Sequence, residues 1–156
     1  MRSVVLLASL AACGGEGTVA VFAYGESFIE DGIPASEVGD GWALSFERFE
    51  VTLRDIRVAG VDLEDPPPVD LTGSSSGSGH ELGRLTAEEG AHSGASFTIA
   101  SVAIEGSATR GADTKSFAWD FEDATAYSAC ETETDVEDGG TADFQVTVHA
   151  DHLLYD

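Results

Sequence analysis

Two histidines near the last residue of the chain are the side chains whose types and spacing best suit chemistry. The segment HADHLLYD places His149 and His152 three residues apart, with Asp151 between them. Imidazole nitrogens and carboxylate oxygens suit Zn²⁺, and they also suit Cu²⁺ or Ni²⁺. The spacing therefore predicts a divalent transition-metal site in which His149 and His152 are ligands. Asp151 would be a third ligand or would orient one of the imidazoles.

The conformation of this segment decides whether the site can form. Side chains alternate between the two faces of a straight strand, so His149 and His152 would then point to opposite sides. A bend at residues 150–152 would bring both imidazoles to one ion. His92 is a further candidate ligand, because it follows Glu89 at the spacing of one helical turn. The alternative is that the histidines are structural or exposed, since 29 acidic residues place carboxylates near most of them by chance.

A second candidate cation site lies in the acidic segment ETETDVEDGGTADF. Its Asp135, Glu137 and Asp138 offer oxygen ligands for Ca²⁺, although the segment lacks the glycine and the glutamate that an EF-hand loop requires. A solvated acidic loop is the alternative. No nucleophile elbow, phosphate-binding glycine loop or dinucleotide fingerprint occurs, so we predict a protein that is not an enzyme. A hydrolase that uses a carboxylate pair is a minor alternative.

Net charge excludes one large class of partner. Seven basic and 29 acidic residues give a formal charge of −22 in a chain of 156 residues. Such a surface repels the phosphates of nucleic acids and the headgroups of anionic lipids. We therefore expect no nucleic acid partner, and the sequence does not identify a protein or polysaccharide partner.

The first residues, MRSVVLLASLAAC, have the order of an export signal: one basic residue, an apolar run and small residues. The run is too short to span the roughly 30 Å of bilayer hydrocarbon as a helix. Residues 10–13, LAAC, resemble the lipobox of bacterial lipoproteins, in which the cysteine is acylated and becomes the first mature residue. This resemblance implies a signal peptide over residues 1–12, lipidation at Cys13 and a tether over residues 13–17. An ordinary secretory signal is the alternative.

Strands are expected to position the candidate sites in one β domain over residues 18–156. Residues 18–24, 42–58, 95–108, 116–122 and 144–148 carry β-branched and aromatic residues with short-range alternation. The apolar residues switch between even-numbered and odd-numbered positions between Phe46 and Phe49, and again between Ile99 and Val102. Each switch predicts a bulge. Glycine-rich and acidic turns separate these runs. The fold class predicted is an all-β antiparallel β-sandwich or related barrel with long irregular loops.

Several local features carry more specific expectations. Residues 59–96 are expected to be largely irregular, with a short helical turn after the capping-box residue Thr86. Another helical turn is expected near residues 36–38. In KSFAWDFED, alternation predicts a half-buried strand with three aromatic side chains, those of Phe117, Trp119 and Phe121, packed inward. Cys130 is left without a cysteine partner once Cys13 is acylated, so it is either half of a disulfide with a missing segment or a buried thiol.

The phrases GESFIEDGIPASEVGDGWALSFERFEV, GSATRGADTKSFAWDFEDATAYSACE and VHADHLLYD resemble uncharacterised acidic exported lipoproteins of myxobacteria and related bacteria. The resemblance implies a location in the cell envelope, at the outer membrane or a periplasm-facing membrane surface, and no particular activity. It also implies that the chain is a fragment, because such relatives continue beyond residues 149–156. We therefore expect a lipid-anchored, non-catalytic protein with a divalent-metal site. The alternative is a calcium-dependent adhesion module.

Overall fold

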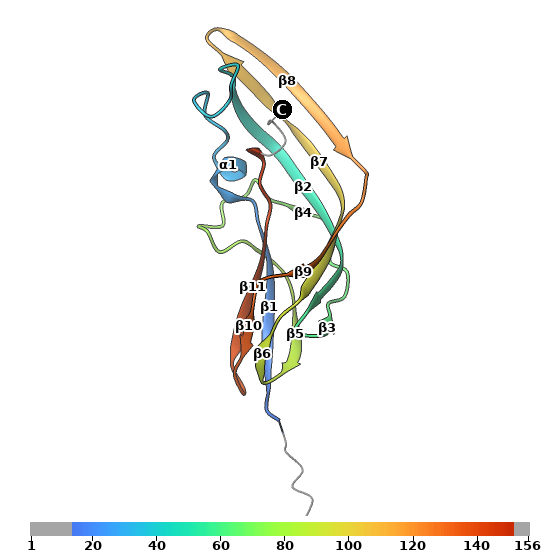
Figure 1. Cartoon of the computed structure of the whole chain (residues 1–156). Helices are drawn as coiled ribbons and strands as arrows, with labels where there is room; N and C mark the ends of the chain where they lie inside the picture. The colour runs from blue at the N-terminus through green and yellow to red at the C-terminus, as the bar shows by residue number, and fades with distance from the viewer. Residues whose placement is uncertain (1–13, 152–156) are drawn as a thin grey trace, which may run out of the picture.

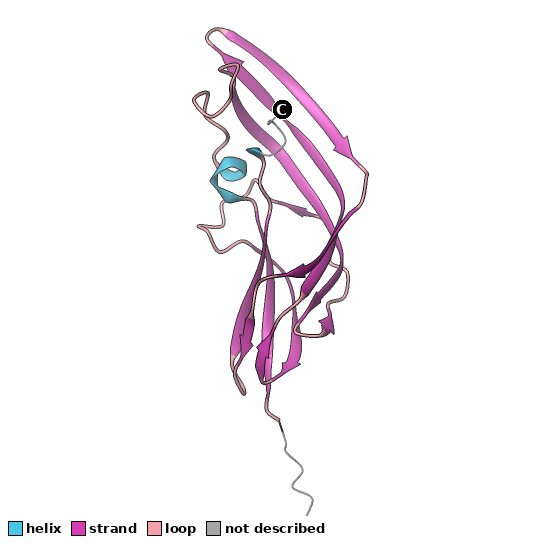
Figure 2. Ribbon diagram, in the orientation of Figure 1, coloured by secondary structure: helices cyan, strands magenta, loops and turns pink. Residues whose placement is uncertain are grey.

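Strands make up nearly all of the regular structure in the computed structural model, which describes residues 14–151 (Figures 1 and 2). The predicted signal peptide, Cys13 and His152 lie outside the described residues. One helix, α1, spans Glu26–Glu30. The strands are β1 Glu16–Tyr24, β2 Ala43–Val58, β3 Val61–Asp62, β4 Val69–Asp70, β5 His80–Glu88, β6 Gly90–His92, β7 Ala95–Arg110, β8 Asp113–Phe121, β9 Thr125–Cys130, β10 Thr134–Val136 and β11 Thr141–Thr147. The predicted all-β, sandwich-like class is confirmed.

A small sheet forms one layer, with the strand order β11-β1-β5. β1 pairs antiparallel with β5 but parallel with β11, which differs from the purely antiparallel arrangement expected. Alternation along β1 buries Val19, Val21 and Ala23, while β11 buries Phe144 and Val146 in the same way. Strands with one apolar face need a second layer to cover that face.

A larger sheet supplies this second layer, with the order β3-β2-β7-β8 and with β4 paired to β2 and β9 paired to β7. The two predicted bulges are confirmed. The pairing of β2 with β7 shifts between Phe46 and Arg48, and it shifts again where Ala100 is left without a partner in the register. Each bulge adds one residue to one strand, so apolar side chains on either side of it stay on the same face.

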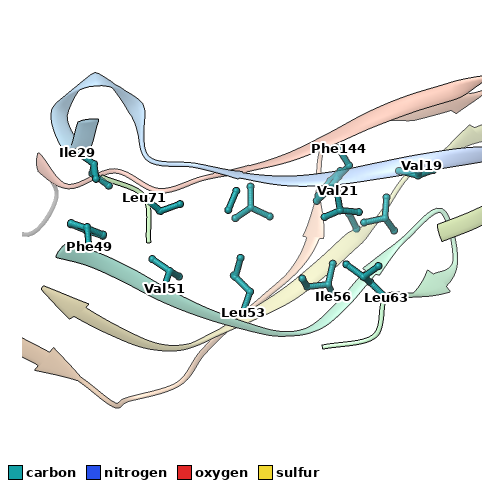
Figure 3. Packing of buried hydrophobic residues seen from close by; sticks show 14 of the residues in the cluster. Val19, Val21, Ile29, Phe49, Val51, Leu53, Ile56, Leu63, Leu71 and Phe144 are labelled. Carbon is teal, nitrogen blue, oxygen red and sulfur yellow. The ribbon is translucent and has the colours of Figure 1, made fainter. Parts of the chain in front are cut away.

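The core lies between the two sheets (Figure 3). Val19, Val21 and Phe144 of the small sheet face Leu53 and Ile56 of β2 across this layer, and all five are buried. Ile29 of α1, Leu71 and Phe49 close one end of the core. Burial of Ile29 explains why α1 forms although its first turn has no side-chain cap. Tertiary packing stabilises so short a helix where propensity alone does not.

Two expected helical turns are absent from the described chain. Residues 35–37 form a hydrogen-bonded turn, and the helix lies earlier, at Glu26–Glu30. Thr86 lies within β5, opposite Thr18 of β1, so the predicted capping box is part of a strand. Sheet pairing outweighs a local capping signal there because Leu85 and Ala87 gain burial against the core. The expectation of a largely irregular span over residues 59–96 is therefore wrong for β5.

The glycine-rich segment after Cys13 is shorter as a tether than expected. β1 begins at Glu16, so two of the expected tether residues belong to the sheet. Gly17 is buried, and a β-carbon at this position would overlap the carbonyl oxygen of Glu137. Close backbone approach, rather than flexibility, therefore requires the glycine. Cys130 at the end of β9 is half-buried and forms no disulfide within residues 14–151.

Asp70 attaches β4 to the large sheet and makes stability depend on pH. Burial opposes ionisation of its carboxyl group, but hydrogen bonds from the backbone of Thr72 and Phe49 and from the Thr72 hydroxyl outweigh that effect and lower the pKa. Because the pKa is lower in the folded state, the carboxylate stabilises the fold at pH values above its unfolded-state pKa of about 4. This stability is lost as pH falls through the folded-state pKa.

Asp70→Asn is therefore expected to lower the free energy of unfolding by about 1 kcal/mol at pH 7, a modest value because the carboxylate is largely solvated. The difference from wild type should shrink as pH falls below about 4. Urea titrations between pH 3 and 7 measure it. Asp113→Asn, an exposed position at the β7–β8 turn, is the control and should change the free energy of unfolding at pH 7 by less than about 0.5 kcal/mol.

Candidate binding cleft

A cleft of about 550 Å³ lies between the large sheet and the segment that follows β11. This volume is within the range of small-molecule sites in proteins, which are concave and mostly apolar. β7, β8 and β9 supply most of its wall, and β2 supplies one core residue. The lining residues are Phe49, Phe97, Ile99, Ser101, Val102, Phe121, Asp123, Thr125, Tyr127, Thr147, Val148 and His149.

The register of the large sheet explains why this wall is apolar. Residues that pair directly across an antiparallel ladder point to the same face. Val102 pairs with Phe121 of β8, and Phe97 pairs with Tyr127 of β9. Val102 also pairs with the buried Val51 of β2, so this face is the continuation of the core face. The cleft wall is therefore an inner sheet face.

The small sheet does not extend over this part of the inner face. In Figure 1 the hairpin of β7 and β8 continues beyond β1 and β11, which lie lower in the view. Trp119, Phe121 and Tyr127 consequently remain 38%, 43% and 44% exposed. The prediction that the aromatic residues of β8 share the inner face is correct, and Phe117 is half-buried against the core as expected, whereas the expectation of inward packing is wrong for Trp119 and Phe121. Three strands in the small sheet cannot cover six in the large one.

Aromatic rings are packed against one another along this face. Phe97 and Tyr127 stack with centroids 5.0 Å apart and an interplanar angle of 20°. Phe117 and Trp119 stack at 4.6 Å, and Phe117 meets Phe46 edge to face at 6.1 Å. Such pairs restrain ring orientation while leaving part of each ring face accessible. Phe97 and Tyr127, which both line the cleft, are therefore held against each other, and the stack of Phe117 and Trp119 lies on the same sheet face outside the lining.

Two titratable side chains lie at the polar rim of the cleft. Asp123 lies in the connection between β8 and β9, and His149 follows β11. The Nδ1 atom of His149 is 3.0 Å from Oε2 of Glu26, the first residue of α1. Glu26 has a φ of 53°, a left-handed conformation that is uncommon for a residue other than glycine. Strained residues of this kind cluster at functional sites.

Basic side chains in residues 14–151 are all engaged away from the cleft. Arg48, Arg54, Arg57 and Arg84 pair with carboxylates. Arg110 and Lys115 lie over the ring of Trp42, at 4.7 and 5.3 Å from its centroid. None of these six lines the cleft. Among residues 14–151, Asp123 is the one carboxylate of the lining, in a protein whose overall formal charge is −22.

Three of the four predicted metal ligands, His92, His149 and Asp151, lie within the described residues. β11 ends before His149, and the chain bends at Ala150 and enters a short turn at Asp151. Such a bend is the condition under which the two histidines of the motif can converge. His152 lies outside the described residues. Within residues 14–151 no three His, Cys, Asp or Glu side chains gather as a metal ion requires, and this includes the acidic residues predicted to bind calcium.

The structure separates His92 from His149, which corrects its place in the predicted site. β5 ends beside Glu16, the first residue of β1, and His92 follows in β6. β11 ends beside Tyr24, the last residue of β1, and His149 follows there. The ends of this nine-residue strand are about 26 Å apart at about 3.3 Å per residue. His92 instead contacts the carbonyl oxygen of Glu88 through Nε2, at 2.8 Å.

The cleft itself was not predicted from the sequence. No local pattern in the sequence indicates it, because which strands cover the aromatic face of residues 113–130 is set by contacts distant in the sequence. Comparisons with protein-family models, with curated proteins and with solved structures find no match for the chain. In the described part of the chain, no helix combines the length and apolar character needed to cross a bilayer.

Proposed function

We propose that this chain is a non-catalytic binding protein, held at the cell envelope by a lipid on Cys13, that takes a small apolar molecule into the cleft. The observation that carries this proposal is an inner sheet face with exposed aromatic rings beside a cleft of about 550 Å³. Exposed apolar patches on soluble proteins mark interaction sites. Rings that are already packed lose little freedom when a ligand covers them.

The membrane anchor is supported by the lipobox-like residues 10–13 and by the place of the β domain directly after them. A lipid at Cys13 would attach the domain through the end of β1 that lies away from the cleft, since the cleft adjoins the end of β11 beside Tyr24. The binding site would thus face away from the membrane. Mass spectrometry of the mature N-terminus tests this, and an unmodified Cys13 would contradict it.

An uncharged aromatic probe tests the cleft directly. We expect 1-naphthalenemethanol to bind the wild-type protein, measured by calorimetric titration, and each of Phe121→Ala and Tyr127→Ala to weaken binding by about tenfold. Both side chains are substantially exposed, so the fold should tolerate the changes. Trp119→Ala is the matched control, because Trp119 is similarly exposed but does not line the cleft. Absence of binding, or equal binding by all variants, would refute the proposal.

A divalent transition metal at His149 is the second candidate function. The observation that favours it is the contact between His149 Nδ1 and Glu26, because metal-ligating imidazoles are commonly oriented by a carboxylate at the other ring nitrogen. We propose His149 and His152 as the ligands, with Asp151 beside them. Zn²⁺ is the ion that best fits such a donor set.

Purified protein loaded with Zn²⁺ is expected to retain the metal after dialysis, and His149→Ala is expected to lose most of it. His92→Ala is the control, because His92 lies at the other end of β1 and should leave metal content unchanged. Elemental analysis measures both. Equal retention by wild type and His149→Ala would exclude this site, and calcium retained by both would favour the calcium-dependent adhesion alternative instead.

A further inference from the structure

The charges around the cleft select a class of ligand. We infer that the cleft takes molecules with an apolar body and a cationic group such as an ammonium. This inference rests on the proposed function, because it assigns a charge preference to the same cleft. Its first support is the lining, which includes the carboxylate of Asp123 and no lysine or arginine.

The basic residues of the described chain cannot easily supply a counter-charge to an anionic ligand. None of the six basic side chains in residues 14–151 lines the cleft. Four arginines pair with carboxylates, and Arg110 and Lys115 lie over the ring of Trp42. His149 is at the rim, where its Nδ1 lies 3.0 Å from Oε2 of Glu26, so this imidazole already has a carboxylate beside it. An anionic ligand would therefore meet the carboxylate of Asp123 and no lysine or arginine of the described chain.

The aromatic wall suits a cation as well as an apolar body. A cation over a tyrosine or phenylalanine ring is attracted by the negative face of the ring. Tyr127 is held by its stack with Phe97 and Phe121 is nearly half-exposed, so both can present ring faces to a ligand. Asp123 belongs to the short connection that joins the strands carrying these two rings. One bound molecule can thus meet aromatic rings and a carboxylate together.

Long-range charge adds to the local preference. The formal charge of −22 concentrates cations near the surface and repels anions. Salt screens this general effect and also weakens the pairing with an exposed carboxylate. Because Asp123 is exposed, its own contribution should be a few-fold change in affinity rather than several orders of magnitude. The preference should therefore be clearest at low ionic strength.

Three naphthyl probes of similar shape test the inference: 1-naphthylmethylamine, 1-naphthalenemethanol and 1-naphthoate. We expect the ammonium probe to bind about fivefold more tightly than the alcohol at low salt, and the carboxylate probe to bind more weakly than both. Asp123→Asn should abolish most of the difference between the ammonium and the alcohol. Asp135→Asn removes the same charge from the exposed residue of β10, outside the cleft lining, and should preserve the difference.

The outcomes separate this inference from the proposed function. If the alcohol binds but the ammonium binds no more tightly, the charge preference is overturned while the cleft remains a binding site. If none of the three probes binds, the proposed function fails and the inference fails with it. If Asp123→Asn and Asp135→Asn reduce the preference equally, the net charge of the protein accounts for it, and the assignment to Asp123 is overturned.

Discussion

Phe49→Ala is expected to lower the free energy of unfolding by about 3–5 kcal/mol, the range observed for removing a large aromatic ring from a packed core. Phe49 is only 1% exposed and meets Phe46 edge to face, with centroids 5.3 Å apart. Its backbone N–H donates to Asp70, and its carbonyl oxygen accepts from the N–H of Leu71. Phe49 therefore contributes to the core, to the attachment of β4 and to the floor of the cleft.

Urea unfolding followed by tryptophan fluorescence measures this loss. Phe121→Ala is the matched control, because its ring lies on the same face but is 43% exposed, so the loss should stay below about 1 kcal/mol. If alanine at position 49 costs no more than alanine at position 121, the distinction between a buried core and an uncovered inner face is wrong.

Gly106→Ala is expected to lower the free energy of unfolding by about 2–3 kcal/mol, as overpacking of an interior does. Gly106 pairs with Phe46 on one side and Phe117 on the other. A β-carbon there would overlap the carbonyl oxygen of Ser45 and lie 2.8 Å from Cζ of Phe117. Neither group can move without disturbing a sheet hydrogen bond or the stacked ring of Trp119.

Gly39→Ala is the control for this substitution. No atom lies within 4 Å of a β-carbon at position 39, and Gly39 does not have a positive φ, so stability should change by less than about 0.5 kcal/mol. Thermal unfolding of both variants gives the comparison. An increase in stability for Gly106→Ala would show that the close approach between β2 and β7 is not present in solution.

Strand content and both bulges could be predicted because they follow from the local alternation of apolar and polar residues. Phe46 and Phe49 cannot share a face unless one residue is added between them, and the same holds for Ile99 and Val102. The structure confirms both shifts of register. Partner strands, however, are set by contacts distant in the sequence. The parallel pairing of β1 with β11 therefore had no local signal.

The cleft could not be predicted because alternation reports which face a side chain takes and not what covers that face. Trp119 and Ile104 lie opposite each other on one face, yet only Ile104 is buried. The difference comes from the extent of the opposite sheet. The placement of His149 beside Glu26 likewise required the fold, since these residues are 123 positions apart. His92 was a candidate ligand because of its spacing from Glu89 in a span expected to be irregular, and the length of β1 separates it from His149.

Backbone amide chemical shifts during titration with 1-naphthalenemethanol test the central claim most directly. The account predicts that changes concentrate in residues 97–102, 121–127 and 147–149, which line the cleft, and that the opposite end of β1 and the β7–β8 turn stay unchanged. Changes that centre on the opposite end of the molecule, or no changes at saturating probe, would contradict it.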